Sequence, residues 1–231
     1  MEAIVLAGGL GTRLRGEIGD VPKPMAPVEG KPFLEYVFEA LIREGVGRAV
    51  LSVGYRHEVI RDRFGDAFGA LSLAYVIEET PLGTGGAIRR SLDATTANVS
   101  FVLNGDTFVD VDLEGMHARH RANGALVSMA VKHVDDVGRF GSLRIVNDVV
   151  TGFIEKGASG PGDINAGVYL LPKNVFDAHD LPERFSFENE FLQPFIGEIA
   201  PRAFRARGPF IDIGVPDDYR SAAAFFKALS R

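Results

Sequence analysis

The stretch IVLAGGLGTRL, residues 4 to 14, runs from an apolar strand into a cluster of glycines and then reaches an arginine. Gly8, Gly9 and Gly11 carry no Cβ, so the chain can turn sharply here and bring backbone N–H groups close to a ligand. The ligand that such a loop favours is a phosphate group. The same pattern also occurs as a bare strand-to-helix turn, and the glycines alone do not separate the two interpretations.

Two cationic residues that follow the glycines favour the interpretation of the loop as a phosphate-binding site. Arg13 comes directly after the cluster, and Lys23 lies between two prolines in the run VPKPM. A guanidinium fork and an ammonium group beside a loop rich in N–H donors suit a triphosphate. A Walker loop is excluded because no Gly-Lys-Ser/Thr follows, and an NAD(P) enzyme is disfavoured because the third glycine of the dinucleotide fingerprint is missing.

The rest of the chain alternates β-branched runs with amphipathic stretches, which is typical of βαβ units and a mostly parallel sheet. We expect strands over 3–8, 48–54, 71–78 and 99–106, and helices over 32–45, 57–64, 85–92 and 113–122. After Gly124, strands are expected over 125–134, 141–146, 149–156 and 164–172, with turns between them. A helix over 188–200, a strand over 208–214 and a helix over 216–229 follow.

These elements predict an α/β fold: a Rossmann-like, mixed and mainly parallel sheet flanked by helices, with a small antiparallel sub-region that binds an acceptor. No repeat or linker interrupts the chain, so we expect a single domain over residues 1–231. Residues 1–123 would mainly bind the nucleotide, and residues 124–231 mainly the acceptor.

The composition of the chain limits the classes of binding partner that we expect. The 231 residues carry a net charge of -6 at pH 7, and Lys and Arg are scattered, so nucleic acid is not expected. No basic leader precedes an apolar segment, and no apolar run approaches about 18 residues, so we expect no membrane partner and a cytoplasmic protein. The chain has no cysteine, which excludes disulfides, thiolate metal sites and a cysteine nucleophile.

Ordered motifs run along the whole chain: LAGGLGTRL (6–14), PKPM (22–25), PLGTGGA (81–87), NGD (104–106), EK (155–156), NAGVY (165–169) and DIGVPDDY (212–219). In this order they resemble the sugar-1-phosphate nucleotidyltransferases, the NDP-sugar pyrophosphorylases. The resemblance implies the nucleotide-diphospho-sugar transferase fold. It also implies in-line attack by a sugar 1-phosphate on the α-phosphorus of an NTP, which gives an NDP-sugar and pyrophosphate.

Two anions meet in that reaction, so cations and N–H donors matter more than a general base. The resemblance implies that Arg13 holds the β- and γ-phosphates and that Lys23 reaches the transferring phosphoryl group. Asp106 completes the catalytic set. It ends a strand at the edge where α/β sheets bind ligands, although a capping or turn aspartate is the alternative.

The resemblance makes Asp106 and Asp212 the two ligands of a Mg²⁺ ion. Physical chemistry agrees, because two adjacent buried carboxylates repel unless a cation or a proton lies between them. The run DVD, with Asp110 and Asp112, is a competing metal pattern, for which we favour surface or turn roles. His117 and His120 lack a third ligand, so we expect solvated side chains.

The nucleotide site implied by the resemblance consists of Leu6, Ala7, Gly8, Gly9, Gly11, Thr12, Arg13, Lys23, Pro81, Gly83, Thr84, Gly85 and Gly86. The amides of Gly85 and Gly86 would contact the base or ribose, although a glycine-rich helix start also serves close packing. The segment lacks the Gln that pyrimidine-specific relatives usually carry. This favours GTP, with UTP, CTP and ATP left open.

The implied acceptor site consists of Gly105, Gly141, Glu155, Lys156, Asn165, Ala166 and Gly167. Lys156 would bind the sugar phosphate, and Glu155 and Asn165 the sugar hydroxyls. The alternative for the Glu-Lys pair is an exposed position at a strand end.

Within the family, the segments DVPKPMAPVEGKPFLEY, FSFENEFL and FIDIGVPDDY most resemble heptose 1-phosphate guanylyltransferases. The expected acceptor is therefore D-glycero-α-D-manno-heptose 1-phosphate. A mannose 1-phosphate guanylyltransferase and a UTP-dependent uridylyltransferase remain alternatives. A third alternative is a catalytically silent binding subunit, which would be expected to lose Arg13, Lys23 or an aspartate ligand. The expected partners are small-molecule substrates, with a homodimer as the assembly we consider.

Overall fold

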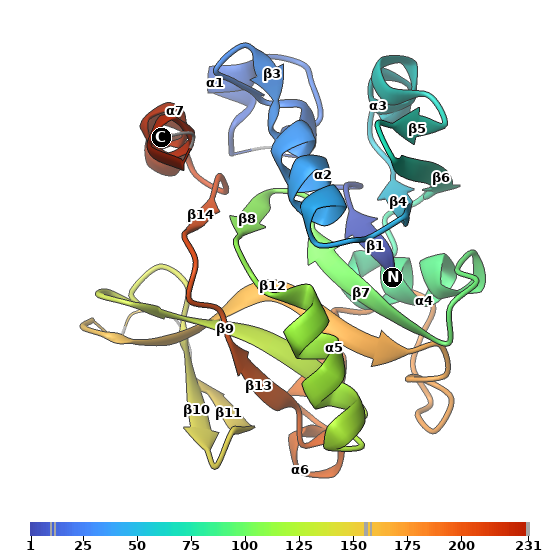
Figure 1. The fold of residues 1–231 in the computed structure, drawn as a ribbon, viewed down its shortest axis with the longest axis vertical. Helices are drawn as coiled ribbons and strands as arrows, with labels where there is room; N and C mark the ends of the chain where they lie inside the picture. Colours follow the sequence, from blue (N-terminus) through green and yellow to red (C-terminus); the bar gives the residue numbers. More distant parts are fainter. Residues whose placement is uncertain (10, 12, 155–156, 158, 230–231) are drawn as a thin grey trace.

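A ten-stranded mixed sheet forms the centre of the molecule (Figure 1). The computed structural model describes residues 1–9, 11, 13–154, 157 and 159–229. The strand order is β10-β11-β13-β9-β12-β7-β1-β4-β6-β5. These strands are β1 (Glu2–Leu6), β4 (Arg48–Val53), β5 (Ala67–Phe68), β6 (Leu71–Ile77), β7 (Val99–Asn104), β9 (Ser128–Val134), β10 (Ser142–Val146), β11 (Val149–Ile154), β12 (Gly162–Pro172) and β13 (Arg202–Arg205). The predicted α/β class with a mixed sheet is confirmed.

The N-terminal half of the sheet is parallel except for its edge strand, β5, which lies antiparallel to β6. Strands β7, β1, β4 and β6 run side by side in the same direction. The helices and short strands of this half are α1 (Arg15–Ile18), η1 (Lys23–Met25), β2 (Pro27–Val28), β3 (Lys31–Pro32), α2 (Phe33–Arg43), α3 (His57–Phe64), α4 (Gly83–Asp93), β8 (Thr107–Val109) and α5 (Leu113–Ala122). The carboxyl ends of the four parallel strands therefore share one edge, where ligand sites of such sheets lie.

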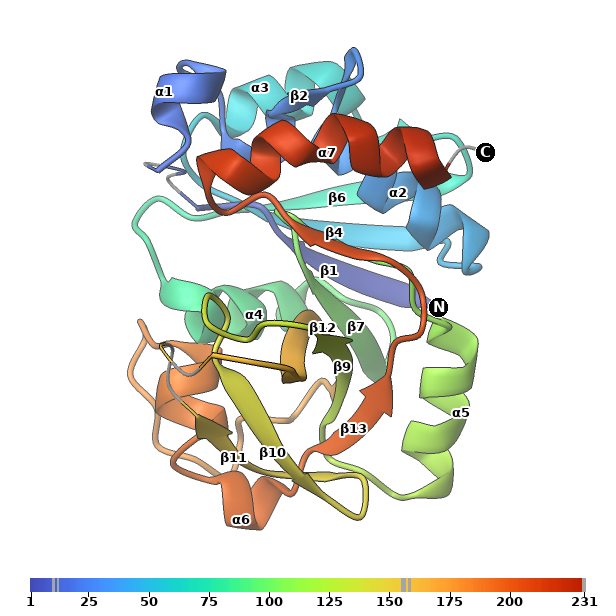
Figure 2. The same ribbon diagram turned by 90° about the vertical axis from the view of Figure 1, so that its left-hand side faces the viewer.

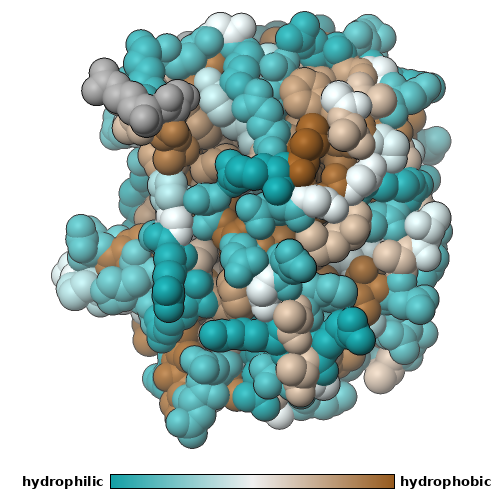
Figure 3. All heavy atoms as spheres, in the orientation of Figure 1, coloured by the Kyte–Doolittle hydropathy of each residue, from teal (hydrophilic) through white to brown (hydrophobic). Residues whose placement is uncertain are grey.

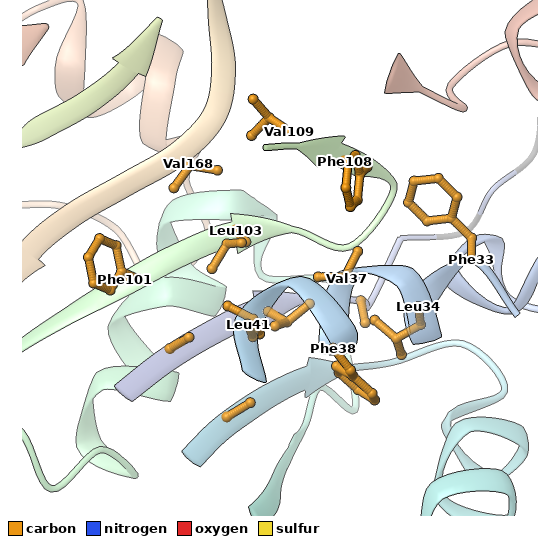
Figure 4. Packing of buried hydrophobic residues seen from close by; sticks show 14 of the residues in the cluster. Phe33, Leu34, Val37, Phe38, Leu41, Phe101, Leu103, Phe108, Val109 and Val168 are labelled. Carbon is orange, nitrogen blue, oxygen red and sulfur yellow. The ribbon is translucent and has the colours of Figure 1, made fainter. Parts of the chain in front are cut away.

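Helix α2 buries one apolar stripe against this parallel half. Leu34, Val37, Phe38 and Leu41 repeat at helical spacing, and all four are at most 2% exposed. Figure 4 shows them facing β1, β4 and β7. Truncating one such side chain to alanine costs about 2–5 kcal/mol, so this layer anchors the sheet edge that carries the site.

The C-terminal half is mixed. Strand β12 lies antiparallel to both β7 and β9 and so joins the two halves. Its remaining elements are η2 (Phe187–Leu192), α6 (Ile196–Ile199), β14 (Phe210–Asp212) and α7 (Pro216–Leu229). The predicted strands of this half are present, and two residues of the predicted strand 149–156 lie outside the described residues.

Two features of the C-terminal half differ from the sequence prediction. The single helix expected over 188–200 is a π-helical turn, η2, followed by the short α6, because Pro194 cannot donate a helical hydrogen bond. The strand β13 was not expected. It inserts between β9 and β11, parallel to β9.

The last helix returns to the first half of the molecule. Figure 2 shows α7 lying near α1 and α2. Phe226 of α7 stacks on Tyr36 of α2 at 3.6 Å between ring centroids, and it meets Phe33 edge-on at 5.9 Å. Strand β14 precedes α7 and, within the described part of the chain, pairs only with β8, in a two-stranded sheet outside the central one.

Hydrophilic side chains cover most of the face seen in Figure 3. Among the described residues, no helix is both long enough and apolar enough to cross a membrane.

Candidate active site

Lys23 and Asp106 meet at the carboxyl edge of the parallel strands. Lys23 is the first residue of η1, and Asp106 lies in the corner between β7 and β8. The Lys23 Nζ donates to Asp106 Oδ2 at 2.5 Å. The Lys23 side chain is 13% exposed and the Asp106 side chain 33%, so the ammonium is shielded from water more than the carboxylate is. Prolines on both sides of Lys23 fix the backbone that presents it.

Asp212 joins this pair from the far end of the chain. The β8–β14 pairing sets Asp212 opposite Thr107, and Ile213 N–H donates to the Asp106 carbonyl at 3.0 Å. Burial raises the pKa of Asp212, and the neighbouring Asp106 carboxylate raises it further. The Lys23 ammonium therefore does not fully offset the repulsion between the Asp106 and Asp212 carboxylates.

The donor set fits a divalent cation that arrives with phosphate. Among the described residues, no group of three or more His, Cys, Asp or Glu side chains could hold a metal ion. Mg²⁺ is commonly held by one or two carboxylates, with substrate phosphate oxygens and water completing its octahedron. Asp106 and Asp212 supply this number of carboxylates.

The glycine loop lies beside this cluster. Gly11 adopts φ +58°, and a Cβ there would lie 3.1 Å from the Lys23 Cβ, so the loop and η1 approach each other closely. Gly9 has open space where a Cβ would point. Arg13 follows on the same loop with an exposed side chain. Thr12, also predicted for this site, lies outside the described residues.

A pocket of about 420 Å³ opens between this loop and the start of α4. Its lining contains six residues predicted to bind the nucleotide, together with Asp106: Leu6, Gly8, Gly9, Pro81, Gly83 and Thr84. The structure therefore brings six of the thirteen predicted nucleotide residues to one cavity. Ala7 is buried in the strand end beneath it.

Glu78 also lines this pocket, and the sequence reasoning missed it. Its carboxylate accepts from Ser52 Oγ at 2.9 Å and from Leu82 N–H at 3.1 Å. A Cβ on Gly8 would lie 2.6 Å from Glu78 Oε1. The available signal was a charge that ends the apolar run LSLAYVIE just before the PLGTGG motif.

Gly85 and Gly86 make different contacts from those proposed for them. Both N–H groups donate to the Phe185 carbonyl, at 2.9 and 3.4 Å. A Cβ on Gly85 would lie 2.1 Å from the Phe185 ring. These contacts favour the close-packing alternative, in which the two glycines let α4 meet the segment before η2.

A second pocket, of about 670 Å³, carries part of the predicted acceptor site. Gly141 and Asn165 line it. Ala166 is buried beside Asn165, and Gly167 N–H donates to Asn165 Oδ1 at 3.0 Å. Gly105 N–H donates to the Leu6 carbonyl beneath the nucleotide pocket. Glu155 and Lys156 lie outside the described residues.

A chain of hydrogen bonds links the two pockets. Asn165 Nδ2 donates to the Tyr169 hydroxyl at 2.5 Å, and that hydroxyl donates to Glu188 Oε1 at 2.7 Å. Glu188 Oε2 accepts from Thr84 Oγ1 at 3.1 Å. Burial, followed by the charge of Glu188, holds the pKa of Tyr169 well above its ordinary value, so Tyr169 remains a donor.

Comparison with known proteins adds to this geometry. The nucleotidyl transferase family matches residues 2–228. The chain belongs to this family. It is 44% identical over 222 residues to a D-glycero-alpha-D-manno-heptose 1-phosphate guanylyltransferase of Aneurinibacillus thermoaerophilus, covering 96% of each chain. It is 46% identical to the protein of the same name in Campylobacter jejuni subsp. jejuni, covering 95% of this chain and 97% of the relative.

A solved structure resembles this nucleotidyl transferase over its whole length. HddC from Yersinia pseudotuberculosis, complexed with GMP-PN, has a TM-score of 0.86 and 37% identity, covering 97% of this chain and 99% of that one. The resemblance to sugar-1-phosphate nucleotidyltransferases is thereby confirmed, and the chain is an enzyme of that class.

Three other polar residues of this nucleotidyl transferase lie away from the site. Asp112 caps α5 by accepting from Gly115 N–H at 2.7 Å, and Asp110 pairs with Arg43 near the surface. The surface and turn roles favoured for them are confirmed. The expectation of a solvated His120 was wrong: it is 5% exposed, and its Nδ1 lies 2.9 Å from Ser128 Oγ.

Proposed function

We propose that this nucleotidyl transferase moves a guanylyl group from GTP to D-glycero-α-D-manno-heptose 1-phosphate and releases pyrophosphate. An oxygen of the sugar phosphate forms a bond to the α-phosphorus of GTP. The bond from that phosphorus to the bridging oxygen breaks, and pyrophosphate leaves with the electron pair. The observation that carries this proposal is the meeting of Lys23, Asp106 and Asp212 at the edge of the glycine-lined pocket.

The residues of this cluster fit the charge changes of the reaction. Arg13 would hold the β- and γ-phosphates, while the Lys23 ammonium would stabilise charge at the transferring phosphoryl group. Asp106 and Asp212 would hold a Mg²⁺ ion, which supplies positive charge to the phosphate oxygens. The attacking phosphate oxygen is already deprotonated, so the protein needs no general base.

Glu78 supports the choice of GTP. A carboxylate accepts hydrogen bonds only, and the guanine edge offers an N1–H and an exocyclic amino group as neighbouring donors. Glu78 lines the pocket that Gly8, Gly83 and Thr84 also line. The two guanylyltransferase relatives and the neighbour complexed with GMP-PN support the same nucleotide.

The names of these two relatives supply the heptose acceptor. We assign the acceptor to the second pocket, with Asn165 on the hydroxyls and Lys156 on the phosphate. Glu155, Gly105, Gly141, Ala166 and Gly167 complete the proposed acceptor site. Because GTP and sugar phosphates are cytoplasmic metabolites, we place the reaction in the cytoplasm, and a homodimer is the assembly to test.

The experiment is pyrophosphate release with Mg²⁺ across a grid of substrates. GTP, UTP, CTP and ATP are each paired with heptose, mannose, glucose and N-acetylmuramate 1-phosphates. We expect the highest kcat/KM for GTP with the heptose 1-phosphate. A maximum at another pair would contradict the proposed substrates and keep the chemistry. Folded protein that binds a nucleotide but releases no pyrophosphate with any pair would support the silent binding subunit.

A further inference from the structure

Segment 185–193, which the proposed chemistry does not use, forms one wall of the acceptor pocket. Glu188, Asn189 and Gln193 line it together with Gly141 and Asn165. Glu188 is the one charged side chain among the described lining residues of that pocket. Its formal charge is negative, and the acceptor of the proposed reaction is an anion at its C1 end.

This charge orients the acceptor. A carboxylate and a phosphate that share a low-dielectric pocket repel each other, so the phosphate must lie away from Glu188. The phosphate must also reach the Lys23–Asp106 cluster to react. The part of the sugar that faces Glu188 is therefore its hydroxyl-bearing end, because hydroxyls donate and a carboxylate accepts.

The wall is held in a fixed position. Phe187 N–H donates to Thr84 Oγ1 at 2.8 Å, and Asn189 N–H donates to Ser186 Oγ at 3.1 Å. The π-helical turn η2 then presents Glu188 and Asn189, which are consecutive in sequence, to the same pocket. Such turns recur at functional sites because the wider turn re-aims side chains.

Resting on the proposed function, we propose that Glu188 and Asn189 bind the exocyclic glycol of the heptose, and thereby set selectivity for a heptose over a hexose 1-phosphate. A D-glycero-D-manno-heptose carries hydroxyls on C6 and C7, whereas mannose carries only the one on C6. Each Glu188 oxygen already accepts one hydrogen bond, from Tyr169 or from Thr84. Each retains a second lone pair, which matches two vicinal hydroxyls. Asn189 adds an amide within the same wall.

The test compares Glu188→Gln and Asn189→Ala with a matched control on the same turn. Glu190→Gln removes a charge two residues away, on an exposed side chain that accepts from Ser186 N–H and does not line the pocket. At saturating GTP and Mg²⁺, kcat/KM is measured for heptose 1-phosphate and mannose 1-phosphate. If mannose 1-phosphate turns over too slowly, its inhibition constant is used instead.

We expect Glu188→Gln to lower kcat/KM for heptose 1-phosphate by about 10- to 100-fold, as for the loss of a hydrogen bond to a charged group. The heptose-to-mannose ratio should fall by about tenfold, while the KM for GTP stays within about twofold. Asn189→Ala should lower the same ratio, and Glu190→Gln should leave it unchanged.

Other results would overturn the inference. An equal loss with both acceptors would make Glu188 a ligand of the ring hydroxyls. A raised KM for GTP at an unchanged acceptor ratio would make it a positioning residue for Thr84. Failure of the proposed function is separate, since it would show in the wild-type protein as absent GDP-heptose formation before any variant is compared.

Discussion

In the proposed mechanism the Lys23 ammonium interacts with two kinds of group, the Asp106 carboxylate and the substrate phosphates. Without substrate the ammonium lies on Asp106, where it neutralises one of two neighbouring carboxylates. In the proposed reaction Asp106 and Asp212 would hold a Mg²⁺ ion that supplies positive charge to the two carboxylates, and the Lys23 ammonium would then be available to the phosphates. A compact charge on a flexible stem can make this change of partner, whereas the planar fork of an arginine is less suited to it.

Replacing Lys23 by Met should therefore remove turnover without unfolding the protein. We expect kcat to fall by about 10²- to 10³-fold, the usual cost of losing one donor at a developing anion. Pyrophosphate release measures the effect. Lys31→Met is the control, because Lys31 pairs with Glu39 on the surface. Near-normal turnover in Lys23→Met with GTP and heptose 1-phosphate would exclude Lys23 from the mechanism.

At this scale the sequence predicted the charged cluster and part of the lining of both pockets, but not the two glutamates that line them. Lys23, Asp106 and Asp212 stood in distinctive motifs, and the structure brings them together. Glu78 and Glu188 stood in ordinary contexts, at a strand end and in an amphipathic segment. A lone glutamate there is usually solvated, and only the folded chain shows that both line pockets.

At the scale of elements, hydrophobic periodicity predicted the long buried strands and α2, whose patterns agree with their packing. Hydrophobic periodicity did not predict the elements whose structure depends on tertiary contacts. The segment RAFR of β13 is short and carries charge at both ends, so nothing local marks it as an interior strand. The prediction of a single helix over 188–200 was wrong because it followed the amphipathic pattern of the segment and gave too little weight to Pro194, which interrupts a helix.

The start of β1 offers an element-scale prediction. Burial alone would raise the pKa of Glu2, but N–H donation from Ala97 and Thr96 and the Arg48 guanidinium hold it below its ordinary value of 4.5. Glu2 thus ties β1 to the loop after α4. Glu2→Gln should lower the free energy of unfolding by about 1.5–3 kcal/mol at pH 7.

The loss of unfolding free energy in Glu2→Gln should become smaller as the pH falls. Because the folded-state pKa is lowered, the stabilisation is complete above about pH 4.5 and is lost as pH falls through the folded-state pKa. Urea unfolding should therefore show a smaller difference between wild type and variant at pH 4 than at pH 7. Glu39→Gln, at an exposed ion pair, is the control and should change little. An equal difference at both pH values would contradict the assignment.

At the scale of the whole molecule, the two halves share one sheet through the β7–β12 pairing, and α7 packs back on α2. We therefore predict one cooperative unfolding transition in calorimetry. GTP with Mg²⁺ should raise the midpoint temperature of that single transition. At a GTP concentration of 100 times the dissociation constant, the free energy of unfolding should increase by about 2.7 kcal/mol. Two separate transitions, of which GTP raises only one, would show that residues 1–123 and 124–231 are independent domains.

The late position of β13 and β14 in the chain has a consequence for biosynthesis. Until residues 202–205 emerge from the ribosome, β9 and β11 lack the strand that lies between them. Lys23 and Asp106 likewise wait for Asp212, nearly 190 residues after Lys23. Between the synthesis of residue 154, where β11 ends, and that of residue 205, where β13 ends, a nascent chain therefore exposes two unpaired strand edges, which are sites of aggregation. The enzyme can complete its sheet and its active site only after residues 202–212 have been synthesised.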